Sequence, residues 1–225
     1  PGRNISRFLD SLADRLNIGL DVRQVWRNDR FGRGGDHTEF LNLGFPAVRF
    51  TVAVENYNWQ HQDLRTEKGI RYGDTVENMD FPYLAKVAKL NIAALAAIAS
   101  APPPPEPKVE GAVSTDTTIK WPFDDVNAKS FVVRWRRTDA PNWEHSRSLG
   151  NLASGTQDSL CVIVAGPQTP TDRTECRVVL RGVRVDDWVF GVSSVSKDGF
   201  ESPVASAVPG GAFKPWVAPP PAAPK

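Results

Sequence analysis

The sequence predicts two domains of different class, an α/β portion followed by an all-β sandwich. Residues 1–100 combine helical and strand-like hydrophobic patterns, whereas the region after the linker contains several short stretches that alternate apolar and polar residues. The proline-rich stretch SAPPPPEPK (100–108) separates the two patterns and cannot continue a helix. The predicted organisation is an α/β portion at 1–100, a linker at 101–108, a sandwich at 109–210 and a proline-rich tail at 211–225.

The first region begins and ends with a predicted helix. Apolar residues recur at helical spacing from Ile5 to Leu16, and this helix is expected to end near Gly19. A second helix is predicted to begin after Asp80, which is suited to cap it, with Pro82 in its first turn. Its apolar face is expected to comprise Tyr83, Leu84, Val87, Leu90, Ala94, Leu95 and Ile98.

A strand is predicted between these helices. The stretch GFPAVRFTVAV (44–54) is apolar and rich in β-branched residues, as in strands that are buried on both faces of a sheet. Helix, strand, long loop and helix is the order found in α/β domains. One or two strands cannot form such a sheet, so we expect the first part of this domain to lie on another polypeptide.

The second region is predicted to form a β-sandwich. Alternating strands are expected at 117–123, 130–138, 176–183 and 187–196, with a turn at KDGFES. Trp121 on an early strand, FVVRWRR on a central one and DWVFGVSSVSKDGFES near the end resemble a fibronectin type III domain over residues 108–208. This resemblance implies a fold but no activity, because such sandwiches serve many binding roles.

Charge and hydropathy exclude two classes of partner. The 27 basic and 26 acidic residues give a net charge of +1, without a basic run, so nucleic acid is not expected as the main partner. The longest apolar run, LNIAALAAIASA (90–101), is too short for a hydrocarbon core of about 30 Å, so no membrane span is expected.

The two cysteines allow two interpretations. Cys161 and Cys176 flank VIVAGPQTPTDRTE, which is either a hairpin closed by a disulfide or a segment between two free thiols. A bridge fits an oxidising compartment. We therefore expect a secreted, periplasmic or cell-surface protein.

Two polar stretches of the first region contain the candidate site residues. In GRGGDH, either the glycines simply allow a turn, with Asp36 capping the next helix, or Asp36 and His37 belong to a site. His61 lies in the loop NWQHQDLRTEKGIRYGDTVENMD (58–80), where it is either a solvated side chain or a ligand.

The order of these pieces resembles the C-terminal half of the co-catalytic zinc exopeptidases, the family of the bacterial zinc aminopeptidases and glutamate carboxypeptidases. The matching pieces are the GGDHTEF turn, LGFPAVRFT, a loop with a histidine, GDTVENMD and the helix YLAKVAKLNIAALAAIA. In that family the loop often reads His-Thr-x-x-Asp-Thr. Here the interval between His61 and Asp74-Thr75 is longer.

The resemblance implies roles for five residues. His61 corresponds to the last ligand of a site that holds two zinc ions, with the remaining ligands on the upstream part. Asp36 and His37 are placed near the substrate pocket, and Asp63 is a candidate orienting partner of His61. Arg33 is either a donor to the oxyanion, a contact to a substrate carboxylate, or a solvated charge.

The function implied is metal-assisted hydrolysis of peptide bonds by an amino- or carboxypeptidase. One imidazole cannot hold zinc for catalysis, so the chain is expected to be active only when it is joined to the upstream half of the peptidase. The chain is then either one product of a cleaved precursor or a fragment. The rival hypothesis is a non-catalytic binding protein, with a peptidase-like remnant and a sandwich that binds partners.

Overall fold

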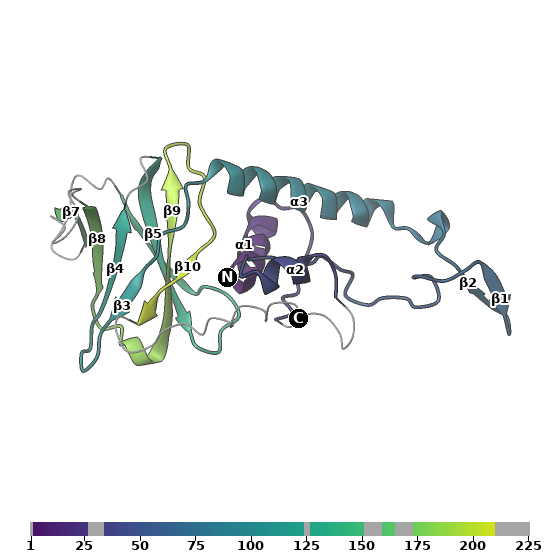
Figure 1. The fold of residues 1–225 in the computed structure, drawn as a ribbon, viewed down its shortest axis with the longest axis horizontal. Helices are drawn as coiled ribbons and strands as arrows, with labels where there is room; N and C mark the ends of the chain where they lie inside the picture. The colour runs from purple at the N-terminus through teal and green to yellow at the C-terminus, as the bar shows by residue number, and fades with distance from the viewer. Residues whose placement is uncertain (1, 27–33, 124–126, 151–158, 165–172, 210–225) are drawn as a thin grey trace, which may run out of the picture. The chain divides into compact units, whose positions relative to one another are not determined.

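The computed structural model describes residues 2–26, 34–123, 127–150, 159–164 and 173–209 (Figure 1). The chain forms two compact units. The first comprises residues 1–102 together with 195–204, and the second comprises residues 103–194 and 205–225. Residues 195–204 belong to the first unit, although the predicted boundaries place them in the sandwich at 109–210.

The first unit contains three α-helices and a small hairpin within its described part. The helices are α1 (Gly2–Arg15), α2 (His37–Asn42) and α3 (Phe81–Ser100), and the short 3₁₀ helix η1 (Val76–Asn78) precedes α3. The hairpin strands are β1 (Arg65–Glu67) and β2 (Ile70–Tyr72). The predicted first and last helices are thereby confirmed.

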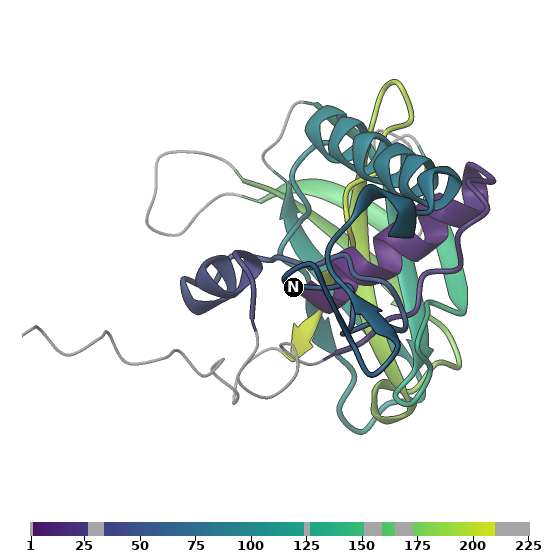
Figure 2. The ribbon, with the colours of Figure 1, turned by 90° about the vertical axis from the view of Figure 1, so that its right-hand side faces the viewer.

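Helices α1 and α3 lie side by side (Figure 2), and they share a small core. Its buried members are Leu9, Leu12, Ala13, Leu90 and Ala94. These residues lie one helical turn or less apart within each helix, which places them on one face. The core therefore forms where the apolar stripe of α1 meets one stripe of α3.

The N-terminus of α3 is capped as the sequence predicts. The backbone N–H of Tyr83 donates to Oδ1 of Asp80 over 2.9 Å, and Asp80 itself has extended backbone angles. Pro82 lies in the first turn, where its missing N–H leaves no intrahelical hydrogen bond unmade. The start of α3 is thus fixed by local chemistry.

The predicted strand at 44–54 is wrong. Residues 45–54 have no helix or strand structure, and their side chains are largely exposed; Val54 is 88% accessible and Phe45 is 59% accessible. A strand that is buried on both faces needs neighbouring strands for its backbone hydrogen bonds and layers on either side. The described residues of this unit supply neither, so the apolar stretch stays extended and uncovered.

Helix α3 is apolar on more than one face. The predicted apolar face of α3 is confirmed only in part: Leu90 and Ala94 are buried and Val87 is half-buried, whereas the other four members, Tyr83, Leu84, Leu95 and Ile98, are exposed. Leu95 is 71% accessible, and Ile92, which lies outside the predicted face, is 67% accessible. With 20 residues, α3 is the one described helix that is long and apolar enough to cross a bilayer by length and composition alone. A helix with this pattern is typical either of a membrane span or of the core of a larger domain.

The second unit consists of two sheets that pack face to face. One sheet has the order β10-β9-β5-β6 and the other β11-β3-β4-β8-β7. Their strands are β3 (Lys108–Glu110), β4 (Thr117–Phe123), β5 (Ala128–Arg137), β6 (His145–Leu149), β7 (Ser159–Val164), β8 (Arg173–Leu180), β9 (Trp188–Ser196), β10 (Ala205–Ser206) and β11 (Val208–Pro209). The four predicted strands are confirmed as β4, β5, β8 and β9, although β8 begins and ends three residues earlier than predicted.

Aromatic residues from both sheets fill the core of the sandwich. Trp121 of β4 meets Phe131 of β5 edge to face, with ring centroids 5.2 Å apart, and Phe123 packs on the same ring at 5.3 Å. Ile119 and Val133 are completely buried beside them. Alternate residues of β4 therefore point inward, which is the pattern that predicted the sandwich. The fibronectin type III resemblance stays a prediction.

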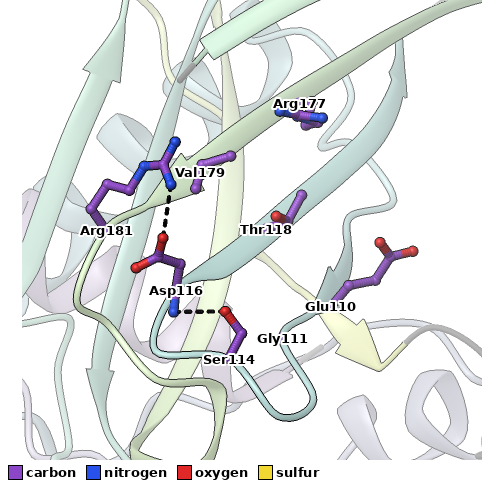
Figure 3. Close-up of a pocket in the computed structure, with 8 residues that line it drawn as sticks. All are labelled: Glu110, Gly111, Ser114, Asp116, Thr118, Arg177, Val179 and Arg181. Atoms are coloured by element: carbon purple, nitrogen blue, oxygen red, sulfur yellow. Dashed lines mark hydrogen bonds and ion pairs between the residues drawn. The ribbon is translucent and has the colours of Figure 1, made fainter. Parts of the chain in front are cut away.

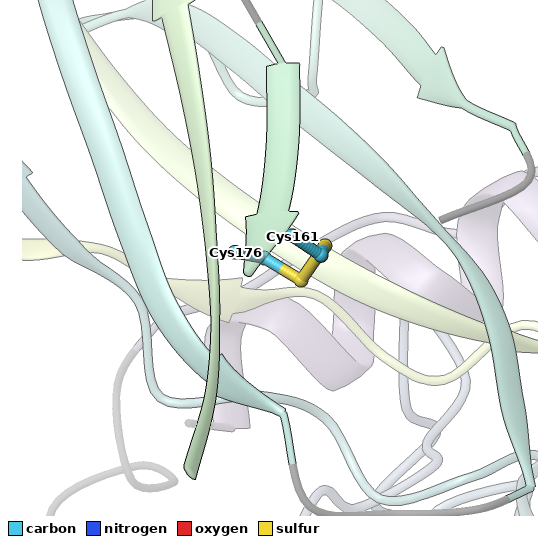
Figure 4. Close-up of a disulfide and its surroundings, with 2 residues drawn as sticks. All are labelled: Cys161 and Cys176. Carbon is cyan, nitrogen blue, oxygen red and sulfur yellow. A yellow bond between two sulfur atoms is a disulfide. The ribbon is translucent and has the colours of Figure 1, made fainter. Parts of the chain in front are cut away.

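Cys161 and Cys176 form a disulfide (Figure 4). The two residues are direct partners in the antiparallel pair β7–β8, and their Cα atoms lie 4.0 Å apart. Of the two predicted alternatives, the bridged hairpin is confirmed and the free thiols are wrong. The bridge ties the edge strand β7 to its neighbour.

The cap of α3 gives the first testable prediction. Asp80→Ala removes the acceptor for the Tyr83 N–H and is expected to destabilise the helical unit by about 1 kcal/mol, whereas Asp80→Asn, which also accepts this bond, changes little. Urea unfolding followed by helical circular dichroism measures the difference. Equal stability of the alanine and asparagine variants would contradict the capping role.

Candidate metal centre

His61 lies at the end of a tight turn that Asn56 begins. The Asn58 N–H donates to the Oδ1 of Asn56 over 3.0 Å, and the N–H groups of Trp59 and Gln60 donate to the Asn56 carbonyl at 3.1 and 3.2 Å. His61 then takes a left-handed conformation with φ of 55°. Histidine is one of the residues that are enriched at positive φ, and the His61 side chain is exposed.

The long interval after His61 is a β-hairpin. Strands β1 and β2 pair in antiparallel register, from Arg65 opposite Tyr72 to Glu67 opposite Ile70. The turn residues Lys68 and Gly69 have φ of 50° and 78°. Two consecutive positive φ values are the pattern of a two-residue type I′ turn, which fits the twist of a hairpin. The insertion relative to the zinc-exopeptidase pattern is therefore a structured element.

Arg65 ties the hairpin to the residues that follow His61. Its guanidinium donates to Oε1 of Gln62 at 2.9 Å and to Oε1 of Glu67 at 2.7 Å, and it lies 4.1 Å from the ring centroid of Tyr72. It also donates to the backbone oxygen of Asp63 at 3.4 Å. The segment after His61 is thus held by side-chain contacts and not by a hydrophobic core.

Asp63 is exposed two residues after His61. Within the described residues, the hydrogen bond that involves Asp63 uses its backbone oxygen, and none joins its carboxylate to the His61 imidazole. The orienting role of Asp63 stays a prediction. Further along the loop, a hydrogen bond from the Thr75 side chain is the largest cause that lowers the pKa of the Glu77 carboxyl.

Asp36 and His37 stand at the start of α2. Asp36 occupies the N-cap position, but its side chain makes no capping hydrogen bond. Thr38 makes the local bonds instead: its N–H donates to the Gly35 carbonyl at 2.9 Å, and its hydroxyl accepts from the Gly35 N–H at 3.5 Å. The alternative in which Asp36 caps the helix is therefore wrong: its side chain makes no capping bond, and the Thr38 N–H, from which such a cap would accept, donates to the Gly35 carbonyl instead.

His37 is half-buried beside the glycine turn. A Cβ placed on Gly35 would lie 3.1 Å from the His37 Nδ1 and 3.6 Å from the Cδ of Arg49, so these two side chains crowd the turn. Arg49 also donates to the Gly34 carbonyl over 3.4 Å. Arg33, the predicted oxyanion or substrate contact, lies outside the described residues.

The described residues around His61 can be compared with the donors that zinc prefers. The exposed His61 imidazole fits as a single ligand, because neutral imidazole nitrogen is a preferred zinc donor. Nowhere in the described ranges do three or more His, Cys, Asp or Glu side chains gather as a metal cage. A zinc ion bound at His61 therefore needs donors from outside this part of the chain.

A shallow pocket of about 340 Å³ lies on the sandwich (Figure 3). Asp116 lies at its edge and accepts from Nη1 of Arg181 and from the N–H of Gly182, both over 2.9 Å. The Gly182 bond, followed by the Arg181 bond, lowers the pKa of the Asp116 carboxyl. Glu110 and Arg177 also line the pocket, so its two carboxylates balance its two guanidinium groups and give no preference for an anion.

Comparison with curated proteins shows relatives among fungi. The chain is 35% identical over 213 residues to a protein of Pyrenophora tritici-repentis (strain Pt-1C-BFP) named probable zinc metalloprotease, in an alignment covering 93% of this chain and 39% of that protein. A probable zinc metalloprotease of Leptosphaeria maculans is 36% identical over 213 residues, covering 93% and 44%. One of Pyricularia oryzae is 34% identical over 218 residues, covering 93% and 39%.

This chain is similar to fungal proteins that are named probable zinc metalloproteases. No protein-family model matches it. The chain spans 39% to 44% of the length of the relatives described above, although those alignments cover 93% of the chain itself. Both the first unit, with His61, and the sandwich therefore have counterparts in these relatives.

The sequence marks His61 as a candidate site residue but not the two asparagines that shape its turn. Asn56 and Asn58 lie in the asparagine-rich ENYNWQH, which is the local signal for a turn of this kind. The pairing of Asn58 with Gly73, whose N–H donates to the Asn58 carbonyl over 3.0 Å, joins residues that are far apart in sequence. No pattern in the sequence marks that bond.

The Asp116 carboxylate gives a pH-dependent prediction for the sandwich. Because its pKa in the folded state lies below the usual 3.8, its bonds stabilise the fold fully above pH 3.8, and this contribution is lost as the pH falls through the folded pKa. Asp116→Asn is expected to lower the thermal midpoint at neutral pH and to flatten the pH dependence below 3.8. The matched control is Asp139→Asn, at an exposed residue after β5.

Proposed function

We propose that this chain is the C-terminal part of a zinc-dependent exopeptidase that hydrolyses peptide bonds when the chain is joined to its upstream part. The observation that carries the proposal is the agreement between the relatives, named probable zinc metalloproteases, and the one imidazole that a tight turn presents to solvent. His61 binds zinc in this proposal, and the substrate is a peptide.

In this proposal, some residues of the chain bind zinc or substrate and one orients the zinc ligand. When bound, zinc supplies Lewis acidity and an activated water for peptide hydrolysis. His61 contributes one of its ligands, and the upstream part supplies the others for a pair of ions. Asp36 and His37 line the substrate pocket from the start of α2, and Asp63 orients the imidazole. Arg33 contacts the substrate carboxylate or the oxyanion.

The upstream part is proposed to cover the apolar surfaces of the first unit. Val54 and Phe45 on the extended segment, and Ile92 and Leu95 on α3, are exposed although they are large and apolar. In soluble proteins, large exposed apolar patches mark interfaces, and these side chains are candidates for such a patch. The relatives are more than twice as long as the part that this chain matches, so they contain enough sequence for the missing layers.

This arrangement also favours a core helix over a membrane span for α3. Leu90 and Ala94 already pack on α1, and the Lys86 ammonium donates to the Gly19 carbonyl over 3.2 Å. A helix that buries one stripe against a soluble helix needs a second protein layer for its other stripe. The disulfide favours an oxidising compartment, so the proposed location is secreted, periplasmic or cell-surface.

The metal assignment is tested by His61→Ala in the protein that contains the upstream part. Loss of a residue that only orients a ligand weakens metal affinity about 10- to 100-fold. Loss of the ligand His61 itself is expected to weaken zinc affinity at least as much and to remove peptidase activity. The control is His145→Ala, because His145 stacks on Trp135 within the sandwich, with ring centroids 5.3 Å apart. Competition with a chromogenic chelator measures the affinity. Zinc retained by His61→Ala would show that the ligand lies elsewhere.

The proposed cover of α3 is tested by charge at its exposed stripe. Ile92→Lys combined with Leu95→Lys is expected to abolish co-purification of the chain with a separately expressed upstream part, because burying two ammonium groups without partners is costly. Lys89→Ala, at an exposed position of the same helix, serves as the control. Unchanged co-purification of the double variant would place the upstream part elsewhere and favour a binding protein with an accessory first unit.

A further inference from the structure

The loop that contains His61 is closed by a hydrogen bond between its two ends, one before the hairpin and one directly after it. The Gly73 N–H donates to the Asn58 carbonyl over 3.0 Å, so residues 58 and 73 meet although fourteen residues separate them in the sequence. His61 lies inside this closed loop. We propose that Gly73 is a positioning residue for the His61 imidazole; the inference rests on the proposed zinc role of His61 and deepens it.

Three hydrogen bonds in series form what we call the Gly73 clasp. The Asn56 side chain accepts from the Asn58 N–H, the Asn58 carbonyl accepts from the Gly73 N–H, and the Gly73 carbonyl accepts from Nδ2 of Asn78 over 3.3 Å. Asn78 is two residues before Asp80, the cap of α3. The clasp therefore connects the histidine turn to the rigid start of the longest described helix.

Only glycine fits at position 73. Its backbone has φ of 134°, which L side chains rarely adopt, and the residue is buried. A Cβ there would overlap the Leu64 side chain and lie 3.3 Å from the Leu64 Cα. Leu64 precedes the hairpin and Gly73 follows it, so their backbones lie close together. The end of the Leu64 side chain can move away from an added Cβ, whereas the tight contact with the Leu64 Cα requires the backbone to shift.

Gly69 in the same hairpin lacks this constraint. It too has a positive φ, 78°, but nothing lies within 4 Å of where its Cβ would be. A side chain at Gly69 strains only the backbone of the hairpin turn. A side chain at Gly73 strains the backbone after β2 and also pushes against Leu64 at the base of the loop. This contrast separates general damage to the hairpin from damage to the clasp.

His61 is exposed, so packing in a core does not hold its side chain in place for metal binding. The hairpin is held by Arg65, through Gln62, Glu67 and Tyr72, and none of these contacts reaches the imidazole. A metal ligand must be held within a fraction of an ångström by the structure behind it, and loops do this less well than helices and strands. The clasp is one link from the His61 turn to a helix end.

The experiment measures zinc affinity in the protein that contains the upstream part, by chelator competition with zinc alone. Gly73→Ala is expected to weaken zinc binding about 10- to 100-fold, the range found when residues that orient a ligand are lost. Gly69→Ala is expected to leave the affinity near that of the parent. The double variant Leu64→Ala/Gly73→Ala, which removes the overlapping side chain, is expected to recover part of the loss.

A second measurement does not depend on metal. In the metal-free protein, trypsin cleavage after Arg65, Lys68 and Arg71 reports on opening of the hairpin. It is expected to accelerate in Gly73→Ala more than in Gly69→Ala. Should Gly73→Ala fail to fold, Asn78→Asp replaces the donor to the Gly73 carbonyl with an acceptor of nearly the same shape, and is expected to shift both measurements in the same direction.

The outcomes separate this inference from the proposed function. If His61→Ala abolishes zinc binding but Gly73→Ala binds zinc like the parent, the positioning role is wrong and the ligand assignment stands. An equal loss in Gly69→Ala and Gly73→Ala would also overturn it, because the effect would then come from strain in the hairpin. If His61→Ala itself retains zinc, the proposed function fails first.

Discussion

The hydrogen bond from the Gly73 N–H to the Asn58 carbonyl closes the loop that contains His61. Before this bond in the chain, the side chain of Asn56 forms part of the turn that ends at His61. After His61, Arg65 of the hairpin donates to Gln62. Without this bond the histidine would sit in a long, polar and exposed loop. With it, the histidine belongs to a closed loop that is anchored close to the start of α3.

The first unit depends on a second constraint, its small core. Leu9 and Leu12 of α1 and Leu90 of α3 are buried, whereas residues on the rest of α3 and on segment 45–54 are exposed. Such an imbalance is costly for an isolated soluble domain, because apolar surface left in water promotes association. The same imbalance is what a domain presents when its remaining layers are supplied by other parts of the protein.

The sandwich is different, because its core is complete in itself. Trp121, Phe131 and Val133 are buried between the sheets, and the disulfide between Cys161 and Cys176 holds β7 to β8. Burying large aromatic side chains is among the strongest stabilising contributions in a domain of this size. The two units thus differ in whether the chain alone can bury its own apolar residues.

The sequence by itself determined the elements that local chemistry controls. The cap at Asp80 and the alternation along β4 depend on neighbouring residues or on a period along the chain, whereas the sequence left both a bridge and free thiols possible for the two cysteines. His61 was found because histidine in a polar loop stood out in a chain with three histidines. Only the tertiary structure decided the rest: segment 44–54 stays extended because a strand needs partners, and Gly73 meets Asn58 because the hairpin brings distant residues together.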